Sequence, residues 1–251
     1  MQIREAVGVK RGDVVVVVGG GGKTTIIEKM AEELLAAGGK VIITTTTKIF
    51  APTNGGPHLL VLTDKDEVFI DTIERSFNEY GLIYVGKDIN RENKLLGISA
   101  PEVRALHGLS APDYLLIEGD GSKGRPFKAP RVNEPVVPEI ATVVIVVVGV
   151  DCIGKALVEK YFYAIDQIKS LTGLEYGEVV NEETIVDIML HPLGYKKSVP
   201  INARWIPFIN KVESQTDEIK AKKTAKLLIS RGVKKVVIGA AKANSSICCI
   251  K

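Results

Sequence analysis

A run of glycines followed by Lys23, Thr24 and Thr25 is the part of the sequence best suited to chemistry. The run follows the apolar segment 14–18, and a helical pattern begins at its end. Glycines let backbone N–H groups converge on phosphate oxygens without obstruction from Cβ atoms. A helix N-terminus adds the positive end of its dipole. The segment therefore predicts a phosphate-binding loop made by Gly19, Gly20, Gly21 and Gly22, together with Thr25.

Lys23 and Thr24 give this loop the pattern of a P-loop. Lys23 is expected to reach the β- and γ-phosphates, and the Thr24 hydroxyl to hold Mg²⁺. The ligands predicted are ATP or GTP with Mg²⁺. The full pattern G-x-x-x-x-G-K-[ST] needs a glycine where Val17 stands, so this is the shorter form G-x-x-G-K-T, which resembles that of Mur-type ligases. The alternative is a glycine-rich turn that binds nothing.

Two carboxylates, Glu118 and Asp120, follow the apolar segment 113–118. Ligands bind at the carboxyl ends of the strands in open α/β sheets. A carboxylate there can hold Mg²⁺ or position an attacking water. We therefore expect Glu118 and Asp120 to act with Lys23 in catalysis and to share the metal with Thr24. The pattern of a strand followed by Glu-Gly resembles the Walker-B region of the P-loop class that includes dethiobiotin synthetase.

Other cations and polar side chains extend the predicted site. In the loop after Asp120, Arg125 and Lys128 are expected to hold a second anionic group, because both side chains bind phosphate. An ordinary charged surface loop is the alternative. The threonine run before Lys48 ends the second predicted strand, where a hydroxyl could ligate Mg²⁺ and Lys48 could meet phosphate. The alternative is that threonine only favours the strand. Asn210 and Lys211, with Glu213, resemble the N-K-x-D motif by which GTPases read the base, although Glu replaces Asp. The alternative is a polar loop that leads into a capped helix.

The elements that must position these residues alternate between strands and helices. Apolar segments rich in Val and Ile predict strands, several without polar alternation, as in a parallel sheet covered on both faces; these are 14–18, 40–46, 59–63, 82–86, 113–118, 142–148, 204–210 and 234–240. Helical patterns follow at 23–37, 64–80 and 214–231, the last opened by a capping box at Ser214. The expected fold is a doubly wound α/β domain over residues 1–251, P-loop NTPase-like and mostly parallel.

Residues 155–200 interrupt this alternation. They carry helical patterns at 164–171 and 182–190 and no clear strand, so we interpret them as a helical insertion within the domain. Residues 244–251 are expected to form a tail or an edge segment. Within it, the neighbouring Cys248 and Cys249 are expected not to bind zinc, because adjacent thiols cannot comfortably face one ion. A reactive thiol is the alternative.

Composition narrows the class of protein. The chain has 251 residues, 45% hydrophobic and 25% charged, as in globular proteins. A net charge of +3 supplies no general field for nucleic acid or membranes, so neither is an expected partner. No apolar run is long enough to span a bilayer, no signal peptide is evident, and an odd count of three cysteines disfavours a disulfide framework. A cytoplasmic location is expected.

Five ordered stretches resemble the YqeC family, accessory proteins of selenium-dependent molybdenum hydroxylases. They are 18–25, the threonine run to Lys48, 118–130, 134–138 and 149–155. The resemblance implies nucleotide-dependent maturation of the selenium-containing molybdenum cofactor of a molybdenum hydroxylase. It also implies selenophosphate, or the phosphate of molybdopterin, as the ligand of the cationic loop.

Three functions remain open from the sequence. The first is an enzyme that couples NTP cleavage to activation or transfer. The second is a nucleotide-gated chaperone that delivers the cofactor and hydrolyses slowly. The third is a Mur-type ligase, for which the chain is short, because it would need an appended ligase domain.

Overall fold

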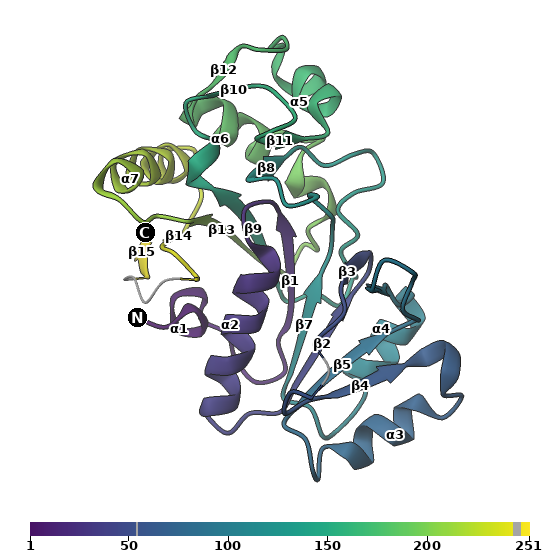
Figure 1. Ribbon diagram of the computed structural model, residues 1–251. Helices are drawn as coiled ribbons and strands as arrows, with labels where there is room; N and C mark the ends of the chain where they lie inside the picture. Colours follow the sequence, from purple (N-terminus) through teal and green to yellow (C-terminus); the bar gives the residue numbers. More distant parts are fainter. Residues whose placement is uncertain (54, 243–246) are drawn as a thin grey trace.

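The computed structural model describes residues 1–53, 55–242 and 247–251. Within this part of the chain, nine strands form one sheet in the order β15-β14-β13-β9-β1-β7-β2-β5-β4 (Figure 1). Neighbouring strands are parallel except for β15, which pairs antiparallel with β14. The strands are β1 (Val14–Gly19), β2 (Val41–Thr45), β4 (Leu59–Leu62), β5 (Leu82–Gly86), β7 (Tyr114–Glu118), β9 (Val143–Gly149), β13 (Arg204–Asn210), β14 (Val236–Ile238) and β15 (Cys248–Ile250).

The central strands are buried on both faces because helices cover both faces of the sheet. In β1 all five valines are fully buried, and they alternate between two apolar clusters. Val14, Val16 and Val18 join the cluster on one face, and Val15 and Val17 join the other. A strand with apolar contacts on both faces needs no polar alternation, which is why the sequence shows an unbroken run.

The helices divide between these two clusters. Helices α1 (Ile3–Val7) and α2 (Lys23–Ala36) pack on one face of the sheet. The other cluster includes residues of α3 (Phe69–Ser76), α4 (Ala100–His107), α5 (Ile165–Thr172), α6 (Glu182–Leu190) and α7 (Gln215–Ser230). No helix in the described ranges has the length and apolarity needed to cross a bilayer. The expectation of an α/β fold around a mostly parallel sheet is therefore confirmed.

The segment from 150 to 203 joins β9 and β13, which are adjacent in the sheet. It lies beyond the carboxyl ends of the strands (Figure 1). The expected helices are present as α5 and α6, but the expectation of no strand is wrong. The segment contains the two-residue strands β10 (Lys155–Ala156), β11 (Phe162–Tyr163) and β12 (Val179–Val180). Two residues are too few to show a periodic pattern, so the sequence could not reveal them.

Strand β11 connects this segment to the loop after β7. It pairs parallel with β8 (Phe127–Lys128), with Phe162 opposite Phe127 and Tyr163 opposite Lys128. Phe127 and Phe162 are fully buried. The residues predicted to hold a second anion therefore lie against the segment 150–203.

The remaining sequence predictions differ from the structure in their bounds. All eight predicted strands belong to the sheet; 82–86 and 204–210 have the predicted bounds, and the others differ by one or two residues at an end. The single helix expected over 64–80 is the short 3₁₀ helix η1 (Thr63–Lys65) followed by α3. Helices α1 and α4 and the antiparallel pairing of β3 (Lys48–Phe50) with β6 (Lys94–Leu96) in a separate small sheet were not expected. The expected tail is in part the edge strand β15, and its residues 244–246 lie outside the described part of the chain.

Candidate functional site

The glycine loop turns the chain from β1 into α2 and packs closely against neighbouring backbone. Gly19, Gly21 and Gly22 have φ values of +100°, +85° and +114°, which other residues rarely adopt. A Cβ atom on Gly19 would lie 2.2 Å from the carbonyl oxygen of Val147, and one on Gly21 would lie 2.2 Å from the nitrogen of Gly149. The loop therefore needs glycine both for its conformation and for its contact with the end of β9.

Three of the loop N–H groups predicted to bind phosphate donate to acceptors within the protein. They belong to Gly19, Gly20 and Gly21. Their acceptors are the Asp120 carboxylate at 2.9 Å, the Val147 carbonyl at 3.0 Å and the Arg125 carbonyl at 3.0 Å. These hydrogen bonds stabilise the loop conformation, and they leave the expected phosphate contacts to the next residues.

The N–H groups at the start of α2 form the second group of loop donors. Within the described residues, the backbone N–H groups of Gly22, Lys23, Thr24 and Thr25 donate no hydrogen bond to the protein. These are the unpaired donors of a helix N-terminus, where the helix dipole favours an anion. An incoming phosphate would find its backbone donors here.

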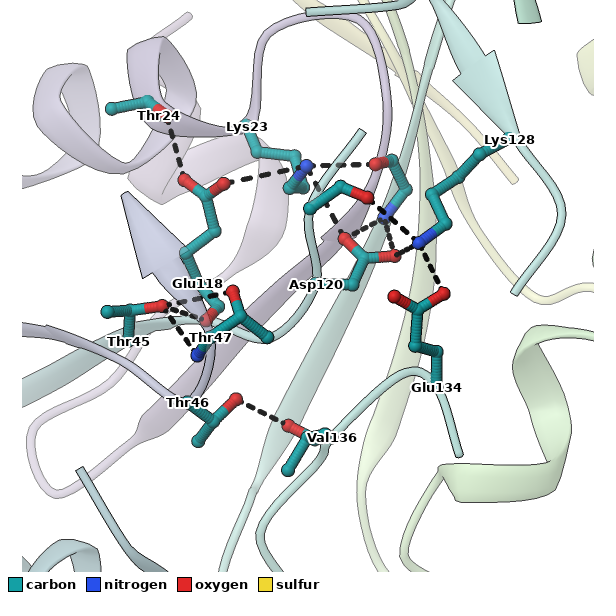
Figure 2. Close-up of polar contacts among 12 residues, drawn as sticks. Lys23, Thr24, Thr45, Thr46, Thr47, Glu118, Asp120, Lys128, Glu134 and Val136 are labelled. Atoms are coloured by element: carbon teal, nitrogen blue, oxygen red, sulfur yellow. Dashed lines mark hydrogen bonds and ion pairs between the residues drawn. The ribbon is translucent and has the colours of Figure 1, made fainter. Parts of the chain in front are cut away.

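Lys23 lies between the two carboxylates that the sequence placed at the end of β7 (Figure 2). Its ammonium donates to the Gly19 carbonyl at 2.9 Å and lies 3.5 Å from Glu118 Oε1 and 3.4 Å from Asp120 Oδ1. Only 4% of Lys23 is exposed, and Asp120 is fully buried. The predicted meeting of these three side chains results from the pairing of β1 with β7, because both strands end at the same edge of the sheet.

The charges in this cluster shift each other's pKa values. Burial tends to lower the pKa of Lys23, but Asp120 and Glu118 outweigh it, so this pKa stands above its ordinary value. Burial raises the pKa of Glu118 despite the opposing effects of Lys23 and the Thr24 hydroxyl. The ammonium is therefore held charged, while the carboxyl of Glu118 gains a proton more readily than an exposed one.

A second lysine extends the cluster away from the glycine loop (Figure 2). The ammonium of Lys128, which is fully buried, lies 3.6 Å from Asp120 Oδ2 and donates to Glu134 at 2.6 Å and to the Gly121 carbonyl at 2.9 Å. Burial tends to raise the pKa of Glu134, but the hydrogen bond from Lys128 lowers it below its ordinary value. Asp120 thus lies between two lysines. Negative and positive side chains alternate along the series Glu118, Lys23, Asp120, Lys128 and Glu134.

The oxygen atoms around Thr24 suit a hard cation. The Thr24 hydroxyl donates to Glu118 Oε2 at 2.7 Å, and Asp120 lies on the other side of Lys23. No group of three or more His, Cys, Asp or Glu side chains able to hold a metal occurs in the part of the chain that the structure describes. Mg²⁺ needs no such group, since it is usually held by one or two carboxylates together with waters and substrate phosphates. The side chains present fit that mode of binding.

Two of the predicted phosphate ligands point away from the glycine loop. The guanidinium of Arg125 donates to the carbonyls of Glu159 and Lys123, although its own carbonyl accepts from the loop. Lys48 is exposed in β3, and the described residues show no contact between it and Lys23 or its partners. The structure therefore brings Lys128, but neither Arg125 nor Lys48, to the charged cluster.

Asn210 connects the glycine loop to the end of β14. Its side chain is buried, donates to the Gly21 carbonyl at 2.8 Å and accepts from the N–H of Ala241 at 2.9 Å. Lys211 instead pairs with Asp151 at 2.9 Å, and Glu213 is exposed. Asn210 thus shapes the loop directly, whereas the ammonium of Lys211 is engaged by Asp151.

Sequence reasoning missed the residues that complete the cluster. No role was expected for Glu134 or for Tyr195, whose hydroxyl donates to the Lys128 carbonyl at 2.9 Å. Thr45 also contributes, since its hydroxyl donates to the Glu118 carbonyl at 2.9 Å and so fixes the end of β7. The available signal was the Glu134-Pro135 pair that follows a loop rich in cations.

The close packing of the glycine loop gives a stability prediction. Replacing Gly21 with alanine is expected to lower the free energy of unfolding by ~2–3 kcal/mol, because left-handed strain adds to the clash with Gly149. Gly38 has a similar φ of +78° but no atom within 4 Å of a Cβ, so Gly38→Ala should cost about 1 kcal/mol. Urea unfolding of both variants measures the difference, and equal losses would contradict the packing argument.

The fold and the site define an α/β protein with a glycine loop at the carboxyl edge of a mostly parallel sheet. The family model described as YqeC protein matches residues 15–166, so the chain belongs to the YqeC family. A relative from Escherichia coli (strain K12), described as "Uncharacterized protein YqeC", is 32% identical over 120 residues. That alignment covers 48% of this chain and 47% of the relative, so the match spans about half the length of each. No solved structure matches significantly.

Proposed function

We propose that the protein binds the polyphosphate of ATP or GTP together with Mg²⁺ at the glycine loop, as P-loop NTPases do. One observation carries the proposal. Lys23, Thr24 and Glu118 meet beside the unpaired N–H groups that open α2, where positive charge, a hydroxyl and a carboxylate are all available to a metal–phosphate complex.

Each side chain has a separate task in this proposal. The Lys23 ammonium would neutralise phosphate charge, while the N–H groups from Gly22 to Thr25 would orient the phosphate oxygens. Thr24 and Glu118 would hold Mg²⁺, which supplies charge neutralisation and a template for the phosphate oxygens when bound. Asp120 keeps the loop in shape through the N–H of Gly19, and its charge keeps Lys23 protonated. Phosphoryl transfer depends mainly on such positioning and electrostatic stabilisation.

As the biological role we propose nucleotide-dependent maturation of the selenium-containing molybdenum cofactor of a molybdenum hydroxylase. Membership of the YqeC family supports this part of the proposal. This role has two forms, an enzyme and a delivery chaperone, which differ in the molecule that turnover requires and in whether a new product forms. An enzyme would turn over with a small-molecule acceptor and give a new product by mass spectrometry, whereas a delivery chaperone would turn over only when an apo-hydroxylase is added.

The binding site can be tested through the hydroxyl of Thr24. Wild-type protein should bind ATP or GTP by calorimetry at least ~10-fold more tightly with Mg²⁺ than with a chelator, because the metal bridges phosphate and protein. Thr24→Val removes the hydroxyl at nearly constant volume and should abolish this difference. Thr25→Val is the matched control and should keep it, because the Thr25 hydroxyl makes no contact with Glu118. Equal affinities with and without Mg²⁺ in the wild type would refute the metal assignment.

A further inference from the structure

A cavity of about 380 Å³ lies between the loop after β8 and the start of α5. Arg131, Asn133 and Glu134 line it on one side, and Asp166 and Gln167 on the other. The volume falls within the range of small-molecule binding sites. Glu134 is also a partner of Lys128, so this cavity adjoins the charged cluster that begins at Lys23.

Cations gather around one aromatic ring beside the cavity. Lys123 Nζ, Lys128 Nζ and Arg131 Cζ lie 5.3, 5.5 and 5.0 Å from the centroid of the Tyr163 ring. Lys197 joins them, since its ammonium donates to the Arg131 carbonyl at 2.5 Å. Partial burial lowers the pKa of Lys197 below its ordinary value. The positive charge of Lys128 lowers this pKa further, whereas the negative charge of Glu134 opposes the shift.

The acids nearby do not balance these cations. Glu134 pairs with Lys128, and within the described residues no carboxylate lies within 4.0 Å of the charged groups of Lys123, Arg131 or Lys197. The remaining acid on the cavity wall, Asp166, offsets one of these three charges at most. Among the described residues that line the cavity, Arg131 is the cation, and Glu134 and Asp166 are the acids. Lys123, Lys128 and Lys197 lie beside Arg131, so four positive charges stand near these two negative ones, an excess of about two that attracts an anion.

We propose that this cavity binds a second ligand, a small molecule carrying a phosphate group, held by Arg131 and Lys197. Phosphate is the preferred anion because a guanidinium donates to it through two N–H groups, and an ammonium adds a point charge. The amides of Asn133 and Gln167 can bind the polar body of the ligand.

The position of the cavity connects it to the glycine loop. Lys23 lies 3.4 Å from one oxygen of Asp120, and Lys128 lies 3.6 Å from the other. The cavity ligand and a nucleotide at Lys23 would therefore lie on opposite sides of one carboxylate. The anion site itself follows from the cations and the cavity, whereas its part in a nucleotide-dependent reaction rests on the proposed function.

Calorimetry with inorganic phosphate on the full chain tests the anion site. Wild-type protein should bind phosphate, and Arg131→Ala and Lys197→Ala should each weaken binding at least ~10-fold, as expected for a charged hydrogen bond. Lys196→Ala is the matched control and should bind normally, because Lys196 lies over the Trp205 ring instead. Both replaced residues of the site are exposed, so the variants should fold, and circular dichroism melts check this.

The same titration on Lys23→Ala separates this inference from the proposed function. Phosphate binding that survives in Lys23→Ala and is lost in Arg131→Ala locates the anion in the cavity, even if ATP and GTP bind to neither protein. Phosphate binding lost in Lys23→Ala but kept in Arg131→Ala would overturn the cavity site. Malonate that binds more tightly than phosphate would overturn the assignment to a phosphate-bearing ligand.

Discussion

Replacing Lys23 with alanine is expected to weaken nucleotide binding by about 100-fold, because the variant loses a charge-assisted contact to phosphate in a buried site. The ammonium is 4% exposed and already lies against the oxygens of Gly19, Glu118 and Asp120. A nucleotide would share this charge with the two carboxylates, and Mg²⁺ would take up part of their charge. Calorimetric titration with ATP and GTP in the presence of Mg²⁺ measures the loss.

A second effect of the same substitution must be separated from binding. Lys23→Ala leaves Glu118 and Asp120 buried next to each other without their common cation, so it also destabilises the fold. Binding is therefore measured at a temperature where the variant is folded by circular dichroism. Lys29→Ala is the control, because Lys29 belongs to the same helix but pairs with Glu32 at the surface. Unchanged nucleotide affinity in folded Lys23→Ala would count against the phosphate-binding loop.

The parts of the fold that could be predicted are those with continuous local patterns. Segments such as β1 and β9 are apolar throughout, and a helix of 14 residues follows the glycines, so periodicity and length identify both. The convergence of Lys23 with Glu118 also followed from the sequence. It required only that two parallel strands end at one edge of a sheet.

The rest depends on contacts between distant segments, for which the sequence carries no local pattern. The Gly20 and Gly21 N–H groups donate to the carbonyls of Val147 and Arg125, which lie more than a hundred residues away in the chain. The sequence therefore could not show that these two N–H groups are already hydrogen-bonded within the protein. The side-chain direction of Arg125 is likewise set by Glu159 in the following segment.

Replacing Lys128 with alanine is expected to lower the free energy of unfolding by ~3–5 kcal/mol, because it leaves the buried Asp120 and the half-buried Glu134 with fewer compensating charges. Asp120 keeps Lys23 and the N–H of Gly19. Among the residues that the structure describes, Glu134 keeps only the hydrogen bond from the N–H of Arg131, at 3.2 Å. Most of the loss should therefore arise at Glu134. Urea unfolding followed by circular dichroism measures it.

A double-mutant cycle tests whether most of this loss of stability arises at Glu134. If the uncompensated carboxylate of Glu134 causes the loss, Glu134→Gln in the Lys128→Ala background should recover about 1–2 kcal/mol, although in the wild-type background it should destabilise. Lys123→Ala is the control, since Lys123 is exposed and lies over the same Tyr163 ring, and it should change stability by less than about 0.5 kcal/mol. A loss below about 1 kcal/mol for Lys128→Ala would show that water reaches both carboxylates. The charge connection between the glycine loop and the cavity would then be too weak to couple two ligands.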